Sequence, residues 1–297
     1  MRATAAEGFI RCAAAVTTTL VAEAARRHET SPTVAAALGR TLTGALLLGS
    51  GLKELDRLTV QLVCDGVVGG ITAEANVRGE VRGYVRNPQA DVPLNALGKF
   101  DVSTLVGRGT FYVTNESGYD IGLYKEPYRG SVPIVSGEIA EDFANYLVKS
   151  EQIPSAVLLG VLMRAREGND APFVEAAGGL MIQVMPGADA RAVATIEETI
   201  KRTPHVTTLV RTGAQPVDLL RAALGDVPFE VLEERAVSFA CPCSYERAVS
   251  MISSIDRGEL ELILREDKGA AMTCHFCNET YRLDESALEN ILAISRA

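Results

Sequence analysis

Residues 58–77 read Leu-Thr-Val-Gln-Leu-Val-Cys-Asp-Gly-Val-Val-Gly-Gly-Ile-Thr-Ala-Glu-Ala-Asn-Val, and apolar residues recur there at every second position. The first run extends from Leu58 to Cys64 and the second from Ile71 to Val77. A period of two places one set of side chains on one face of a strand. Asp65-Gly66 lies between the runs and is a turn signal. The stretch therefore predicts two strands of a mostly antiparallel sheet.

Helical patterns flank this region. Before it, Val16, Leu20, Val21 and Ala24 recur at helical spacing, and Thr30-Ser31-Pro32 supplies a cap and a first-turn proline for a second helix. After it, we expect a helix from Ser136-Gly137, a second helix with the stripe Val193, Ile196 and Ile200, and a third with the stripe Val217, Leu220 and Leu224. We also expect strands at Thr110–Thr114, Tyr119–Tyr124, Ala156–Met163 and Gly179–Met185. Strands grouped together with helices around them indicate the α+β class.

The composition changes along the chain and predicts three parts. Residues 1–186 form an α+β domain with a mostly antiparallel sheet and packed helices. Residues 187–240 form a helical connector, because short apolar stripes alternate there with many charges and need a docking surface. Residues 241–297 form a small four-cysteine zinc domain. The chain of 297 residues, 47% of them hydrophobic, is long enough for such an arrangement.

Charge and hydropathy exclude several classes of function. The net charge is −9 and the chain has no Trp, which argues against a nucleic-acid-binding face. The most apolar stretch, Thr41–Leu52, has twelve residues and is too short to span a bilayer. Glu7 stands where a secretion signal needs basic residues. We therefore expect a cytoplasmic protein that binds neither nucleic acid nor membrane.

Four cysteines crowd together as Cys241-Pro-Cys243 and Cys274-His-Phe-Cys277. In a reducing compartment such pairs indicate a metal site or redox chemistry. Four thiolates suit one tetrahedral Zn²⁺ and leave no open position for a substrate. The sequence therefore predicts one structural or switching zinc per chain, held by these four residues. His275 is expected to point outward, and Cys12 and Cys64 are expected to be small buried residues.

Two interpretations of this zinc domain stay open from the residues. A static ribbon would only hold the C-terminal residues together. A switch would unfold when an oxidant attacks the thiolates, because 57 residues form a marginal core and structural zinc supplies about 10–16 kcal/mol of folding energy. The Cys-X-Cys spacing favours the switch, since its two thiols can pair once the metal has left.

Motifs outside the cysteines extend the pattern over nearly the whole chain. They include Thr30-Ser31-Pro32, Gly83-Tyr84-Val85-Arg86-Asn87-Pro88, Gly137-Glu138-Ile139-Ala140-Glu141-Asp142, Ser150-Glu151-Gln152-Ile153-Pro154 and Gly178-Gly179-Leu180. With the two cysteine pairs, the chain resembles the family of 33 kDa redox-regulated heat-shock chaperonins. Pro242 between the first two cysteines and His275 between the second two depart from other members, but neither removes a ligand.

The resemblance implies an ATP-independent holdase, a chaperone that keeps unfolding proteins from aggregating during oxidative stress. It implies that the reduced, zinc-bound form is inactive. Oxidation would form the disulfides Cys241–Cys243 and Cys274–Cys277, release zinc and unfold the zinc domain with part of the connector. Apolar surface would then bind unfolded or oxidatively damaged client proteins, and the active form would be a homodimer.

Two other classes of function fit less well. The sequence has no phosphate-binding loop, no Gly-x-Ser-x-Gly and no His-Glu-x-x-His, so we predict that it is not an enzyme. The acids Glu141, Asp142 and Glu151 are expected to form a solvated face. A static zinc ribbon that docks a protein partner is the alternative, because residues 232–297 hold twelve acidic and seven basic residues and do not suit nucleic acid.

Overall fold

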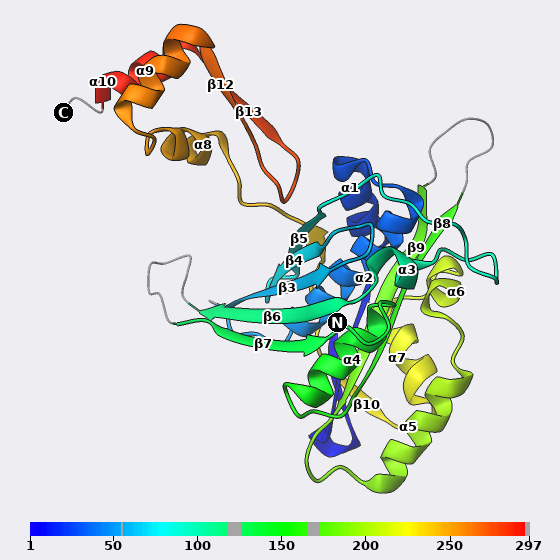
Figure 1. Cartoon of the computed structure of the whole chain (residues 1–297). Helices are drawn as coiled ribbons and strands as arrows, with labels where there is room; N and C mark the ends of the chain where they lie inside the picture. The colour runs from blue at the N-terminus through cyan, green and yellow to red at the C-terminus, as the bar shows by residue number, and fades with distance from the viewer. Residues whose placement is uncertain (55, 118–125, 165–172, 295–297) are drawn as a thin grey trace. The chain divides into compact units, whose positions relative to one another are not determined.

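Two compact units make up the computed structural model, Met1–Ala240 and Cys241–Ala297 (Figure 1). The structure describes residues 1–54, 56–117, 126–164 and 173–294. Both units mix helices with antiparallel sheets, so the predicted α+β class is confirmed. The three-part division of the chain stays a prediction.

The first sheet of the larger unit holds strands from the start, the middle and the end of that unit. Its order is β10-β1-β2-β9-β8, and neighbouring strands pair antiparallel. The bounds are β1 (Arg2–Ala5), β2 (Ile10–Val16), β8 (Ser155–Arg164), β9 (Phe173–Val184) and β10 (Phe229–Glu233). The prediction of a helix from Val16 is therefore wrong in part, because Val16 ends β2 and the helix begins at Thr18.

The second sheet contains the alternating stretch. Its order is β11-β5-β4-β3-β6-β7, antiparallel except where β11 runs parallel to β5. The bounds are β3 (Asp56–Cys64), β4 (Ile71–Asn76), β5 (Glu80–Val85), β6 (Gly109–Ser117), β7 (Tyr128–Pro133) and β11 (Ser238–Phe239). Leu58, Val60 and Leu62 are buried, as their alternation predicts. The expected strand Tyr119–Tyr124 lies outside the described residues.

Helix α2 (Pro32–Gly49) lies in the core of this unit and contacts strands of both sheets (Figure 1). All of its residues except Pro32, Arg40 and Leu48 are buried, and most of them are apolar, which is typical of a helix inside a core. Ser31 caps it as predicted, since its Oγ accepts the N–H of Val34 at 3.2 Å and Pro32 follows. α1 (Thr18–His28), α3 (Val102–Val106) and α4 (Ala140–Lys149) complete this core. Among the described residues no helix is long and apolar enough to cross a membrane.

The segment after Gly187 covers the opposite face of the first sheet. α6 (Val206–Arg211) contacts β8 and β9, and α7 (Pro216–Leu224) contacts β2 and α5 (Ala190–Arg202). These helices form a second core with side chains of the first sheet. Along the strands of that sheet, these side chains alternate with the ones that face α2. The segment then continues into β10 and β11, one strand for each sheet. Residues 187–240 are thus helical in their first part and belong to both sheets in their last part.

The smaller unit is a hairpin with three helices. β12 (Gly269–Thr273) and β13 (Thr280–Asp284) pair antiparallel, and α8 (Tyr245–Ile252), α9 (Arg257–Glu266) and α10 (Glu285–Ile294) pack around them. Over its described residues, 241–294, the core cluster of buried apolar side chains consists of Ile252, Leu260, Leu283, Leu288, Ile291 and Leu292. A core of this size leaves the unit only marginally stable without a further link.

Candidate metal centre

The first cysteine pair lies on the loop that leads into α8. Ser244 ends this loop as the cap of α8, and its Oγ accepts the N–H of Arg247 at 3.2 Å. Arg247 reaches back, and its Nη1 donates to the carbonyl of Pro242 at 2.8 Å. Pro242 therefore lies in a loop that the following helix holds from its first turn, with Cys241 and Cys243 on either side of the anchored carbonyl.

The second pair lies in the turn of the β12–β13 hairpin. The N–H of Cys274 donates to the carbonyl of Glu279 at 2.9 Å, and the N–H of Asn278 donates to the carbonyl of Cys274 at 2.7 Å. Asn278 has a φ of 59°, a left-handed conformation that Asn tolerates better than most residues. These bonds close the knuckle and bring Cys274 and Cys277 to the same side of it.

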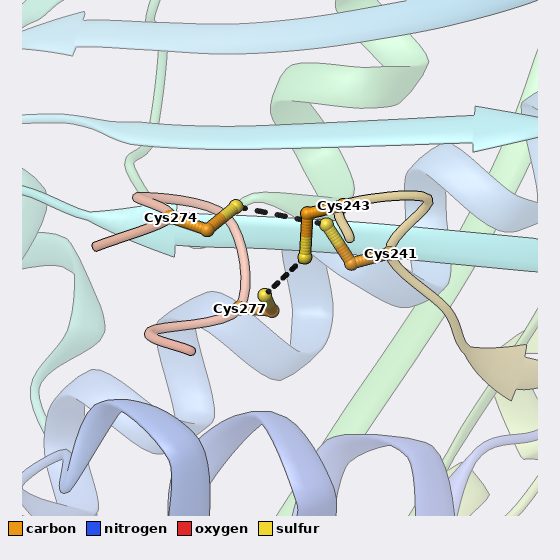
Figure 2. A group of neighbouring side chains, drawn as sticks. All are labelled: Cys241, Cys243, Cys274 and Cys277. Atoms are coloured by element: carbon orange, nitrogen blue, oxygen red, sulfur yellow. Dashed lines mark hydrogen bonds between the residues drawn. The ribbon is translucent and has the colours of Figure 1, made fainter. Parts of the chain in front are cut away.

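The four sulfur atoms converge from these two loops (Figure 2). All of them lie within 4.8 Å of one another. The Sγ atoms of Cys241 and Cys274 are 3.7 Å apart, and those of Cys243 and Cys277 are 3.2 Å apart. A tetrahedral zinc site with Zn–S bonds near 2.3 Å separates its sulfurs by about 3.8 Å. The sulfur positions therefore fit a four-thiolate zinc site.

The four sulfur atoms are partly shielded from solvent. Cys277 is buried, with 2% of its surface exposed, and the other three cysteines are half-buried. Burial raises the pKa of the Cys243 and Cys277 thiols above the ordinary value. The hydroxyl of Tyr281 donates to the Sγ of Cys243 at 3.1 Å, and this bond together with burial raises the pKa of Tyr281. Neighbouring thiolates also repel one another, and a divalent cation between them would offset that repulsion.

A family model described as "Hsp33 protein" matches residues 1–284. The chain belongs to the Hsp33 family. Known relatives agree over almost the whole length. The chain is 42% identical over 292 residues to the 33 kDa chaperonin of Desulforamulus reducens, covering 98% of this chain and 96% of the relative. It is 44% identical over 292 residues to the 33 kDa chaperonin of Bacillus subtilis, covering 98% and 97%.

A solved Hsp33 structure shows the same fold. The 33 kDa chaperonin of Thermotoga maritima superposes with a TM-score of 0.87 at 34% sequence identity, covering 99% of this chain and 97% of that one. The resemblance found in the sequence motifs is therefore confirmed. The relatives in Desulforamulus reducens and Bacillus subtilis both carry the name 33 kDa chaperonin.

Three other predicted residues can be placed in the Hsp33 chain. His275 is exposed on the knuckle, and the four-cysteine group found among the described residues does not include it. Cys12 is buried in β2, and burial raises its pKa to about 12. Cys64, at the end of β3, is only half-buried, and burial raises its pKa as well. Both thiols are thus predominantly protonated at neutral pH, which disfavours attack on an oxidant.

Sequence reasoning missed several supporting side chains of this Hsp33 chain. The expected solvated face of acids is wrong for Asp142, which is fully buried and accepts three backbone N–H groups, although Glu141 is exposed as expected. Neither Tyr281 nor Arg247 was among the predicted site residues. A hydroxyl four residues after a knuckle cysteine is the one sequence feature that could have directed attention to Tyr281.

Proposed function

We propose that the chain is a redox-regulated, ATP-independent holdase that binds unfolding proteins after its thiols are oxidised. The observation that carries this proposal is the convergence of four sulfurs in a unit whose own apolar core is small. A catalytic zinc keeps an open coordination position, and four cysteine ligands leave none. The group is therefore suited to holding structure and to releasing it, rather than to transforming a substrate.

Cys241, Cys243, Cys274 and Cys277 would hold one Zn²⁺ in the reduced protein. The bound ion would supply a link between the loop before α8 and the hairpin turn. A structural zinc is worth about 10–16 kcal/mol at neutral pH, whereas whole domains are stable by about 5–15 kcal/mol. Loss of the four thiolates would therefore unfold residues 241–297.

Hydrogen peroxide would oxidise a pair of these thiols to a disulfide in two steps. A thiolate attacks one oxygen, an S–O bond forms, the O–O bond breaks, and the leaving hydroxide takes up a proton to become water. A second thiol then displaces the oxygen of the sulfenic acid as water, and the S–S bond forms. Two molecules of peroxide thus convert four thiols into two disulfides and four waters. We propose the pairs Cys241–Cys243 and Cys274–Cys277.

The consequence we propose is exposure of apolar surface that binds unfolded or oxidatively damaged client proteins. In the domain arrangement we propose, residues 1–186 are the chaperone domain, residues 187–240 transmit the change and residues 241–297 sense the oxidant. We further propose that the active form is a homodimer in the cytoplasm and that neither nucleic acid nor membrane is a partner. The net charge of −9 supports the absence of a nucleic-acid or membrane partner, because it repels phosphate groups. The same charge helps keep an exposed apolar surface in solution.

Zinc release and client aggregation should be measured together, with and without hydrogen peroxide. Zinc is followed with a chromogenic chelator, and aggregation is followed by light scattering of a thermally unfolding client. We expect oxidation to free about one zinc per chain and to suppress aggregation, and we expect a thiol reductant with zinc to reverse both effects. If zinc stays bound and the client aggregates equally in both samples, the unit is a static ribbon that docks a protein partner.

A further inference from the structure

Tyr281 lies on the hairpin of the second cysteine pair but bonds to a cysteine of the first. Its hydroxyl donates to the Sγ of Cys243 at 3.1 Å. Cys243 belongs to the loop before α8, whereas Tyr281 is on β13, opposite Met272 of β12. The bond therefore joins the two ligand loops at a sulfur atom, without needing the metal between them.

The strand geometry accounts for the direction of the side chain. Residues of β13 alternate between the two faces of the hairpin, so Tyr281 shares the face of buried Leu283, and Thr280 and Arg282 are exposed. A cross-strand bond between the hydroxyls of Thr273 and Thr280, 3.0 Å apart, holds the hairpin next to the knuckle. Tyr281 is thus oriented by a regular element and not by a loop.

A hydrogen bond to a thiolate changes its chemistry. Groups outside the ligand set orient ligands and tune the site, and bonds to thiolate sulfur withdraw electron density from it. The thiolate is the nucleophile that attacks peroxide, and its rate rises with its intrinsic nucleophilicity. A donor at Cys243 therefore slows formation of the S–O bond at that sulfur. It also takes up one direction from which an oxidant can approach.

From this geometry we infer that Tyr281 is a positioning residue that sets the oxidation threshold of the four-cysteine site through Cys243. The inference rests on the proposed function, in which these cysteines hold zinc and are oxidised. In the oxidation, peroxide is reduced to water, and the Cys243 sulfur is oxidised to a sulfenic acid and then to a disulfide. Tyr281 exchanges no electrons and alters only how readily the sulfur attacks.

The test compares Tyr281→Phe with Tyr245→Phe in the full reduced chain loaded with zinc. Tyr245 lies in the same unit, on α8, and 42% of it is exposed. We expect Tyr281→Phe to bind one zinc and to release it with peroxide about three- to ten-fold faster than wild type. Tyr245→Phe should release zinc at the wild-type rate. Mass spectrometry of alkylated peptides should show that Cys243 is lost faster in Tyr281→Phe.

A spectroscopic measurement separates tuning of the sulfur from a merely structural role. With Co²⁺ in place of zinc, removal of a donor from a thiolate should move the sulfur-to-cobalt charge-transfer band to longer wavelength. The ligand-field bands should stay unchanged, because the tetrahedral geometry is kept. Incorporation of 3-fluorotyrosine at position 281 makes the hydroxyl a stronger donor, so it should shift both the rate and the band in the opposite direction.

The outcomes distinguish this inference from the proposed function. If wild type binds no zinc, or releases none with peroxide, the proposed function is overturned and the inference falls with it. If wild type releases zinc and Tyr281→Phe does so at the same rate with the same cobalt spectrum, the inference alone is overturned. A Tyr281→Phe chain that binds no zinc in the absence of oxidant also overturns it, because Tyr281 then supports the fold and not the threshold.

Discussion

The Oδ2 atom of Asp142 accepts the backbone N–H of Ile139 at 3.0 Å, and Ile139 has a φ of 73°. A β-branched residue rarely adopts this left-handed conformation, which costs on the order of 1–3 kcal/mol. Ile139 is nevertheless fully buried, so its side chain packs in the core while its backbone turns into α4. The carboxylate of Asp142 stabilises that turn, because its Oδ1 also accepts the N–H groups of Val135 and Ser136.

Asp142→Ala should therefore destabilise the larger unit by about 3 kcal/mol, since it leaves three backbone donors without a partner and releases a strained turn. Asp142→Asn, which keeps one acceptor oxygen, should cost less. The measurement is the free energy of unfolding in urea. Glu141→Ala is the matched control, because Glu141 is the exposed neighbour on the same helix, and a change within about 0.5 kcal/mol is expected. Equal effects at both positions would contradict this account.

Tyr146 makes the free energy of unfolding of the larger unit depend on pH in the alkaline range. Burial, and then the hydrogen bond that its hydroxyl donates to Oε1 of Glu151 at 2.5 Å, raise the pKa of Tyr146 above its ordinary value near 10. Above pH 10 the unfolded chain loses this proton while the folded chain keeps it. Stability contributed by Tyr146 is therefore complete below pH 10 and falls by up to about 1.4 kcal/mol per pH unit above it.

Tyr146→Phe should remove that dependence. At pH 8 the variant should be less stable than wild type by about 1 kcal/mol, because the hydrogen bond is lost. Between pH 8 and pH 11 the gap should shrink and then reverse. Urea unfolding of both proteins at a series of pH values gives the comparison. A gap that stays constant over this range would show that Tyr146 does not titrate on unfolding.

Gly44 permits a close contact between α2 and Phe143 of α4. A Cβ atom at this position would lie 2.3 Å from Cε2 of Phe143, far inside van der Waals contact. Gly44→Ala should lower the stability by about 1–3 kcal/mol despite the better helix propensity of Ala, because Phe143 is fully buried and cannot move freely. Thermal unfolding measures the loss. At Gly51 a Cβ would meet only the carbonyl of Leu48 at 3.8 Å, so Gly51→Ala should leave the melting temperature nearly unchanged.

The zinc site can be tested one ligand at a time. Cys274→Ser should weaken zinc binding by at least about a hundredfold, because it removes one soft ligand of the tetrahedron. Cys64→Ser is the control, since Cys64 lies at the end of β3 in the other unit. Competition with a chelator of known affinity measures the zinc affinity of both variants. Wild-type affinity in Cys274→Ser would remove Cys274 from the proposed ligand set.

Removal of the metal should affect the two units differently. Stripping zinc from the reduced chain should abolish amide protection in residues 241–297, because the apolar core formed by the described part of this unit is small. Strands β3 and β4 should keep their protection, because their core is large and contains no zinc ligand. Hydrogen exchange followed by mass spectrometry reports both regions in one sample. Protection that persists after residue 241 would show that the smaller unit is stable without metal.

Local patterns predicted part of the fold well. The alternation from Leu58 to Cys64 gave β3, and Ser31-Pro32 gave the start of α2, because both signals depend on neighbouring residues. Strand β2 was not predicted because it is buried on both faces. Ala13 and Ala15 face the core around α2, whereas Cys12 and Ala14 face the second core. Such a strand has no alternation to detect.

Interactions between distant residues account for the other misses. β10 and β11 are short, and what makes them strands is their pairing with β1 and β5 far earlier in the chain. In the candidate site, the spacing of the cysteines was sufficient to predict the group of four. The roles of Tyr281 and Asp142 depend on which atoms their side chains reach, and a single sequence carries no record of that.

The pairing of Ala5 with Phe229 has a consequence for synthesis on the ribosome. β1 leaves the ribosome long before β10, the strand that covers its outer edge, which is made only near the end of the larger unit. At about 5–20 residues per second, that edge waits on the order of ten seconds or more for its partner. During this interval the nascent chain carries an open edge able to pair with other strands. A protein proposed to protect others from aggregation is thus itself exposed to that hazard while it is being translated.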